Sequence, residues 1–190
     1  ISEEQYQYAQ QRVKAEGLEN RITLLKEDYR DLTGQYDKLV SVEMIEAVGK
    51  QYLPTFFKTC NDRLKPGGIM ALQAITIADQ RYNSYSRSVD FIQKHIFPGG
   101  FLPSIQLMSQ LYKTQTQMVV RNVQDMGKSY AETLKRWQIA FNSKRAELEP
   151  LGYDERFSRL WNYYFSYCQG GFLEESVSVV QLTASKGRYE

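Results

Sequence analysis

The sequence contains little cysteine, little histidine and no long hydrophobic run. Its two cysteines, Cys60 and Cys168, are too few for a disulfide framework and fit a reducing compartment. Its single histidine, His95, cannot anchor a His-rich metal site or complete a persuasive Ser-His-Asp set. No apolar run approaches the ~20 residues of a membrane-spanning helix. A disulfide scaffold, a His-rich metal site and a membrane span are therefore excluded.

Neither sign of charge is in excess. Twenty-four Lys and Arg against 22 Asp and Glu leave a formal charge of +2, which gives no support for nucleic-acid binding. The chain has no G-x-G-x-x-G motif and no P-loop, so a phosphate cradle has no support. A length of 190 residues, 42% of them hydrophobic and 13% aromatic, rules out disorder and suits one domain with room for an insertion.

The first residues predict that the chain is a piece of a longer protein. It opens at Ile1, without Met or a signal-type apolar stretch, and goes directly into a helix-start pattern. Ser2 and Gln5 have the spacing of a capping box, and Gly17 ends the predicted helix.

The pattern of elements predicts an α/β domain with a mostly parallel sheet. After the first helix we expect two strands, then a helix that stops at the Lys-Pro-Gly-Gly turn, then a buried strand. The second half is expected to hold a helix capped by Ser104, a strand, two helices with aromatic faces and a closing strand. The expected strands are residues 21–26, 36–42, 69–77, 116–123 and 176–184, and the expected helices include residues 50–64, 105–112, 130–141 and 157–168.

Three polar stretches follow predicted strands, at Glu27-Asp28, residues 43–46 and residues 73–79. The carboxyl ends of parallel strands are where such sheets bind ligands, and a carboxylate there can accept hydrogen bonds from an amino group or a sugar hydroxyl. A solvated loop explains the same stretches equally well.

The loop at residues 96–103 is rich in Pro and Gly yet strongly apolar, so it should line a buried surface or a hydrophobic ligand site. The aromatic faces at residues 130–141 and 157–168 fit the wall of the same cavity, or plain core. Cys168 on the second face is expected in the core, and His95 is expected to be structural.

Four motifs carry a resemblance to a known family: Asp28-Tyr29-Arg30-Asp31, residues 40–49 (Val-Ser-Val-Glu-Met-Ile-Glu-Ala-Val-Gly), residues 64–68 (Leu-Lys-Pro-Gly-Gly) and residues 96–104 (Ile-Phe-Pro-Gly-Gly-Phe-Leu-Pro-Ser). Residues 130–137, 156–157 and 163–164 continue the match over nearly the whole chain. The chain resembles the cyclopropane-fatty-acyl-phospholipid synthases, S-adenosylmethionine-dependent enzymes that include the mycolic acid cyclopropane synthases.

The resemblance implies a class I, Rossmann-like methyltransferase sheet that lacks its first two strands, with a helical insertion at about residues 79–115 covering an acyl pocket. Such enzymes transfer the methyl group of S-adenosylmethionine to the cis double bond of a phospholipid acyl chain. A bound bicarbonate then removes a proton from the carbocation to close a ring. The apolar loop and the aromatic helices fit the tunnel that this chemistry needs.

Site residues follow from the resemblance one position at a time. For the cofactor, Gln5 matches a contact to the ribose, Asp28 the acceptor for the adenine amino group, and Val42 an apolar neighbour. No metal is implied.

For the bicarbonate site, Glu46 matches the glutamate and Tyr130 the tyrosine, and Ile75 matches a position that offers its backbone carbonyl. Gln73 stands where the family has a histidine, and Ala47 replaces the usual histidine after Glu46. Because glutamine carries no charge, we expect bicarbonate binding and ring closure to be impaired and a methyl-branched or unsaturated product to become credible.

The Gly-rich cofactor loop and two central strands of the family have no counterpart here, so the strand at residues 21–26 should be separated from the strand at residues 36–42 by a gap two strands wide. A buried gap of this kind is unfavourable. We expect a rearranged sheet, or another chain in the gap, including a swapped homodimer.

The leading hypothesis is a cytoplasmic lipid-directed methyltransferase, peripheral to the membrane and inactive as this piece alone. A non-catalytic lipid- or partner-binding relative and a methyltransferase for a small acceptor are the alternatives. Seven basic residues late in the chain fit contact with anionic headgroups or a solvated helix face. They are Lys128, Lys135, Arg136, Lys144, Arg145, Arg156 and Arg159.

Overall fold

The computed structural model describes residues 2–187. The chain divides into two compact units, Ile1–Gly34 and Gln35–Glu190. Each unit is described by itself.

The first unit contains one helix, α1 (Glu3–Ala15). The predicted capping box is confirmed, because the Gln5 amide N–H donates to Ser2 Oγ at 3.1 Å and Gln5 Oε1 accepts from the Ser2 N–H at 3.3 Å. The strand predicted at residues 21–26 is wrong, since this stretch is irregular. Ile22 and Leu25 are 40% and 47% exposed, and a β-prone run forms no ladder without a neighbouring strand in its unit.

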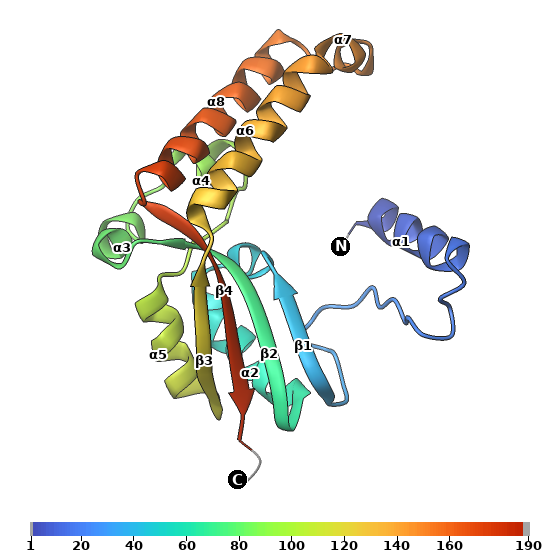
Figure 1. Cartoon of the computed structure of the whole chain (residues 1–190), viewed down its shortest axis with the longest axis vertical. Coiled ribbons are helices and arrows are strands. Elements are labelled where there is room, and N and C mark those ends of the chain that lie inside the picture. The colour runs from blue at the N-terminus through green and yellow to red at the C-terminus, as the bar shows by residue number, and fades with distance from the viewer. Residues whose placement is uncertain (1, 188–190) are drawn as a thin grey trace. The chain divides into compact units, whose positions relative to one another are not determined.

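The second unit is built on a four-stranded sheet in the order β1-β2-β4-β3 (Figure 1). Its strands are β1 (Tyr36–Val42), β2 (Leu64–Ile77), β3 (Met118–Asp125) and β4 (Val177–Lys186). β1 pairs with β2 in parallel, whereas β4 runs antiparallel to both β2 and β3. The four strands lie where the sequence predicts them. The expectation of a mostly parallel sheet is wrong for this part of the chain, because a buried apolar run does not reveal the direction of its partner.

Two helices cover the face of the sheet on which Met70 and Leu72 are buried. They are α2 (Leu53–Arg63) and α5 (Ile105–Gln115). Phe57 of α2 and Tyr112 of α5 meet edge to face with ring centroids 4.8 Å apart, and both are almost fully buried. The predicted cap of α5 is confirmed, since the Leu107 N–H donates to Ser104 Oγ at 3.2 Å.

A helical hairpin extends beyond the sheet (Figure 1). Its long arms pack side by side because the aromatic face of each supplies the hydrophobic surface that the other needs. The arms of the hairpin are α6 (Gly127–Ser143) and α8 (Glu155–Leu173), and the connection between them holds α7 (Arg145–Leu148) and η3 (Glu149–Leu151). The other short helices of the unit are η1 (Ile45–Ala47), η2 (Lys50–Tyr52), α3 (Asp79–Tyr85) and α4 (Phe91–His95).

Candidate functional site

The two parallel strands bring their carboxyl ends to one edge of the sheet. Val42, the last residue of β1, is paired with Gln73 of β2, and the next N–H, of Glu43, donates to the Gln73 carbonyl at 2.9 Å. Glu43 adopts a φ of +50°, an uncommon backbone conformation for a residue other than glycine. This turn directs the chain from β1 into η1, which carries Glu46.

Glu46 is a largely buried carboxyl group. Its Oε1 accepts from the Ile75 N–H at 2.5 Å, while its Oε2 is buried without a hydrogen-bond partner among the described residues. Burial raises the pKa of Glu46 to about 7, and the nearby negative charge of Glu43 adds to the shift. A carboxyl group that titrates near neutral pH can both hold and release a proton under physiological conditions.

A chain of polar side chains crosses the edge of the sheet beside Glu46. Gln181 Nε2 donates to Gln73 Oε1 at 2.9 Å, and Gln73 Nε2 donates to Glu43 Oε1 at 2.8 Å. The hydroxyl of Tyr130, from α6, donates to Glu43 Oε2 at 3.1 Å. Burial, and then the charge of Glu43, raise the pKa of Tyr130 above its ordinary value, so this hydroxyl remains a donor.

The predicted bicarbonate-site residues are thus brought to one place. Glu46 touches Ile75 directly, whereas Tyr130 and Gln73 are joined through Glu43. Ile75 contributes its N–H to this contact, and whether its carbonyl binds an anion stays a prediction. Glu43 was not singled out from the sequence, although it lies within one of the polar stretches and one of the motifs.

The apolar loop at residues 96–103 contacts the backbone of Glu46. The Phe101 N–H donates to the Glu46 carbonyl at 2.9 Å, and Phe101 is 5% exposed. Pro103 is also buried, and its carbonyl accepts from the Ile77 N–H at 3.0 Å. The prediction of a buried surface is confirmed for these residues, whereas Phe97 is 54% exposed, and whether it lines a ligand site stays a prediction.

The aromatic faces of α6 and α8 pack mainly against each other. Trp161, Tyr164 and Cys168 lie against a buried cluster that includes Leu134 and Phe165. Most of the aromatic residues on α6 and α8 are therefore part of the hydrophobic core of the hairpin. Tyr130, at the start of α6, both contacts this cluster and reaches Glu43.

The predicted cofactor residues belong to both units. Gln5 forms the capping box of α1, and Asp28 lies in an exposed loop of the first unit. Arg30 binds both oxygens of Asp28, at 2.9 and 2.6 Å, and lowers the pKa of this carboxyl to about 2. Val42 of the second unit is 60% exposed and offers an apolar surface at the end of β1.

The remaining reactive side chains have structural surroundings. Burial raises the pKa of both Cys60 and Cys168 to about 12, so neither thiol is activated, as expected for core residues. His95 ends α4 with its ring centroid 5.5 Å from that of Phe91. Within residues 2–187, no group of His, Cys, Asp and Glu is arranged to hold a metal ion. No described helix is long and apolar enough to cross a bilayer.

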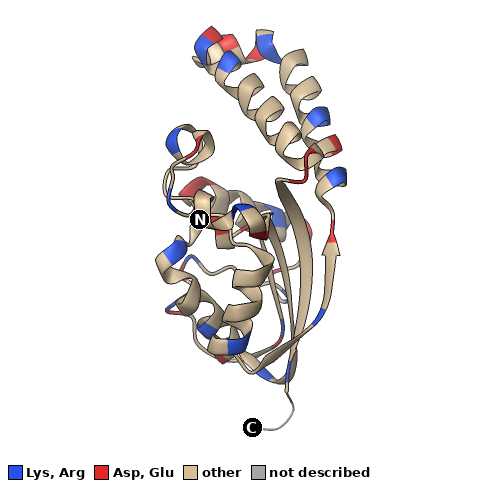
Figure 2. Ribbon diagram, turned by 90° about the vertical axis from the view of Figure 1, so that its left-hand side faces the viewer, with Lys and Arg blue, Asp and Glu red and all other residues tan. Residues whose placement is uncertain are grey.

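Most of the late basic residues have acidic partners. Acidic and basic segments alternate at the far end of the helical hairpin (Figure 2). Five of the seven form exposed ion pairs, namely Lys128 with Glu175, Arg136 with Glu132, Lys144 with Glu147, and Arg145 and Arg159 with Glu155. Such pairs contribute little to stability, and they reduce the charge available to a headgroup.

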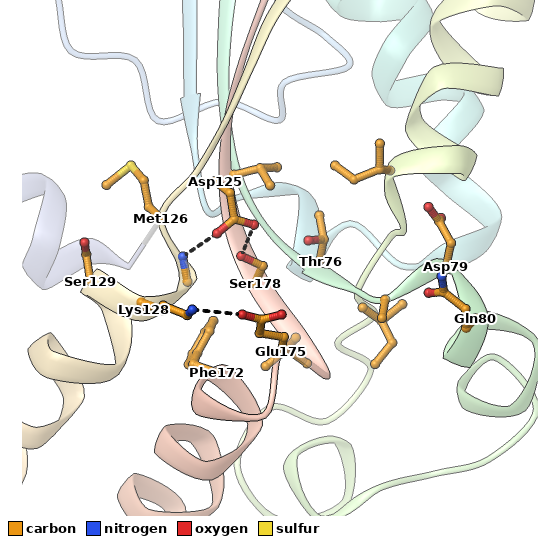
Figure 3. Close-up of a pocket in the computed structure, with 16 residues that line it drawn as sticks. Thr76, Asp79, Gln80, Asp125, Met126, Lys128, Ser129, Phe172, Glu175 and Ser178 are labelled. Carbon is orange, nitrogen blue, oxygen red and sulfur yellow. Dashed lines mark hydrogen bonds and ion pairs between the residues drawn. The ribbon is translucent and has the colours of Figure 1, made fainter.

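A cavity of about 550 Å³, distinct from the site around Glu43 and Glu46, lies between the start of α6 and the end of α8 (Figure 3). Its charged groups already have partners, and Asp79 accepts from the Gln106 N–H at 2.9 Å. Asp125 accepts from the Gly127 N–H at 3.0 Å and from Ser178 Oγ at 2.6 Å, and Lys128 pairs with Glu175 at 3.1 Å. Because neither Glu46 nor Tyr130 lines it, we do not assign the candidate site to this cavity.

The chain matches known proteins over nearly its whole length. The model of the mycolic acid cyclopropane synthetase family matches residues 1–182. The chain is 41% identical over 183 residues to the tuberculostearic acid methyltransferase UfaA1 of Mycobacterium tuberculosis, covering 96% of this chain and 43% of that protein. It is 37% identical over 188 residues to a cyclopropane-fatty-acyl-phospholipid synthase of Escherichia coli, covering 98% of this chain and 46% of that protein.

A solved structure shows the same fold. The crystal structure of mycolic acid cyclopropane synthase CmaA1 complexed with SAH and CTAB superposes with a TM-score of 0.86 at 26% identity, covering 97% of this chain and 67% of that one. The present chain spans less than half the length of UfaA1 and of the Escherichia coli synthase.

Proposed function

Because this chain belongs to the mycolic acid cyclopropane synthetase family, we propose that the complete protein containing it transfers a methyl or methylene group from S-adenosylmethionine to the double bond of an unsaturated phospholipid acyl chain. The product would be a cyclopropane or methyl-branched fatty acid. The observation that carries the proposal is the buried carboxyl group of Glu46, which accepts from the Ile75 N–H, in a residue whose backbone carbonyl binds the apolar loop.

The chemistry needs a proton acceptor in surroundings that exclude water, because water would capture a carbocation. Tyr130 donates to Glu43, the charge of Glu43 acts on Glu46, and burial raises the pKa of both Glu46 and Tyr130. In the proposed site Glu46 holds a proton near the reacting chain, and Tyr130 orients the Glu43 carboxylate. Gln73 fixes the position of Glu43, and the backbone N–H of Ile75 fixes that of Glu46. Bicarbonate is not required by this arrangement.

For S-adenosylmethionine we propose Gln5, Asp28 and Val42 as contacts. The chemistry of these side chains fits the group: an amide for ribose hydroxyls, a carboxylate for the adenine amino group and an exposed apolar side chain. A carboxylate can accept about four hydrogen bonds, and Arg30 supplies three to Asp28, so room for one more donor remains. The cofactor would supply an electrophilic methyl group.

We propose that residues 79–115 cover the acyl pocket. Phe91 of α4 meets Tyr163 of α8 edge to face at 4.6 Å, and Phe97 meets Tyr164 at 6.3 Å, so this segment and α8 form a continuous aromatic surface. α5 anchors the end of the segment against α2 and β3. An aromatic and aliphatic wall of this kind suits an acyl chain.

The substrate's location implies peripheral contact with the membrane. Of the seven late basic residues, Lys135 and Arg156 form no ion pair among the described residues, so their charge is available to anionic headgroups. β1 is an edge strand of the described sheet, so its open side is available to a strand from elsewhere in the complete protein or from a second copy in a swapped dimer.

The test is to incubate the complete protein with methyl-labelled S-adenosylmethionine and vesicles of dioleoylphosphatidylglycerol. We expect label in the lipid, and none with vesicles of saturated lipid or with residues 1–190 alone. Mass spectrometry of the product distinguishes a ring from a branch. Lipid that stays unlabelled while the protein binds the vesicles would favour the second candidate, a non-catalytic lipid-binding relative, which the uncharged Gln73 and the replacement Ala47 favour.

A further inference from the structure

Glu43 is held as an acceptor on both of its carboxylate oxygens. Gln73 Nε2 donates to Oε1 at 2.8 Å and the Tyr130 hydroxyl donates to Oε2 at 3.1 Å. Both donors come from elements far away in the sequence, 30 and 87 residues from Glu43. The half-buried carboxylate is thus fixed in place by the fold.

The orientation of the Gln73 amide is set by a third residue. Gln181 lies directly opposite Gln73 in the antiparallel β2–β4 pair and donates to Gln73 Oε1 at 2.9 Å. With its oxygen occupied in this way, the amide presents its N–H groups toward Glu43. Gln181 therefore acts as a positioning residue for the carboxylate.

The backbone at Glu43 is unfavourable for its residue type. A φ of +50° suits glycine and is strained for a glutamate. Strained residues of this kind cluster at functional sites, where the surrounding structure holds them in place. The carboxylate that results lies beside Glu46, whose buried Oε2 has no partner among the described residues.

We propose that Glu43 is the built-in base of the site and takes the role of a bound anion. This inference rests on the proposed methyl transfer. The donors that would hold an external bicarbonate, Tyr130 and the residue at position 73, each already donate a hydrogen bond to the Glu43 carboxylate. Glutamine at position 73 is then a functional residue, because a neutral amide can donate to Glu43 and accept from Gln181 at the same time.

The methyl carbon bonds to one alkene carbon as its bond to sulfur breaks, which leaves a neutral thioether and a positive charge on the other alkene carbon. The Glu43 carboxylate takes a proton from a carbon next to the charge or from the new methyl group. The electron pair of the broken C–H bond forms a double bond in the first case and closes the ring in the second. The Glu43 carboxyl group then releases its proton to solvent.

The experiment compares Glu43→Gly with wild type in the complete protein, measuring label transfer to dioleoylphosphatidylglycerol in buffer purged of bicarbonate. Glycine removes the carboxylate and suits the positive φ, so the variant should melt no lower than wild type. We expect wild type to be active without bicarbonate, and Glu43→Gly to be slower by about 10²-fold, the usual scale for a lost base. Added bicarbonate or formate should restore part of that rate, because either fits the vacated space.

Two further variants serve as controls. Glu43→Gln keeps the shape but not the charge, so it should be slow and should not respond to bicarbonate or formate. Glu132→Gln removes an exposed carboxylate of α6 that pairs with Arg136 and should leave the rate unchanged. An unchanged rate in Glu43→Gly, or a wild type that needs bicarbonate, would overturn the role of Glu43 alone. A wild type that transfers no methyl group would overturn the proposed function as well.

Discussion

Replacing Glu46 with glutamine should remove a pH dependence from the stability of this protein. In the native state Glu46 accepts one hydrogen bond, from the Ile75 N–H, and its second oxygen is buried without a partner among the described residues. The charged form is therefore poorly solvated, and burial raises the pKa from 4.5 to about 7. Glutamine mimics the protonated carboxyl group, since its amide oxygen can still accept from Ile75.

The sign of the effect follows from proton binding. Between pH 4.5 and about pH 7 the folded protein holds a proton on Glu46 that the unfolded chain has released. Stability is therefore highest below pH 4.5 for this group and falls as the pH rises through the folded pKa. Each pH unit in the window corresponds to about 1.4 kcal/mol, so the loss is about 3 kcal/mol and is complete near pH 8.

The assay is urea unfolding of the complete protein, followed by circular dichroism at several pH values from 5 to 8. We expect the free energy of unfolding to fall with pH in wild type and to stay nearly level in Glu46→Gln. Glu132→Gln is the matched control, because it makes the same replacement at an exposed glutamate of α6, and it should keep the wild-type slope. A level wild-type profile, or the same slope in Glu46→Gln, would refute the burial argument.

Two further changes test other parts of the molecule. Asp28→Ala should weaken binding of S-adenosylmethionine several-fold in calorimetry while Glu27→Ala does not, and equal affinity in both would remove Asp28 from the proposed cofactor site. Gly68→Ala should lower the free energy of unfolding by about 1–3 kcal/mol, because its Cβ would lie 2.9 Å from the carbonyl oxygen of Lys65, whose backbone cannot yield. Gly170→Ala, whose Cβ meets no atom within 4 Å, should be neutral or stabilising, and a loss as large as that of Gly68→Ala would contradict the steric account.

Much of the secondary structure could be predicted because its causes are local. The capping box of Ser2 and Gln5 and the Ser104 cap of α5 follow from residues three positions apart. β1 and β2 follow from short apolar, β-prone runs. The strand expected near Ile22 failed, since a strand also needs a neighbour, which no local pattern specifies.

The candidate site could be predicted only in part. The motif around Glu46 and the position of Tyr130 are visible in the sequence through the family resemblance. The role of Glu43 is not visible, because its contact with Tyr130 spans 87 residues and depends on how α6 leaves the sheet. Whether the loop at residues 96–103 is buried also depends on its hydrogen bond to Glu46, which left Phe101 inside and Phe97 exposed.

The sequence by itself determined the long helices, the four strands of the sheet and the family to which this chain belongs, because caps, apolar periods and motifs act over a few residues. The tertiary structure alone decided which side chains surround Glu43. β4 returns antiparallel beside β2 and places Gln181 opposite Gln73, a pairing that spans 108 residues. Strand order and direction are properties of the whole sheet, so the function of a glutamate at the end of β1 becomes visible only when the sheet is assembled.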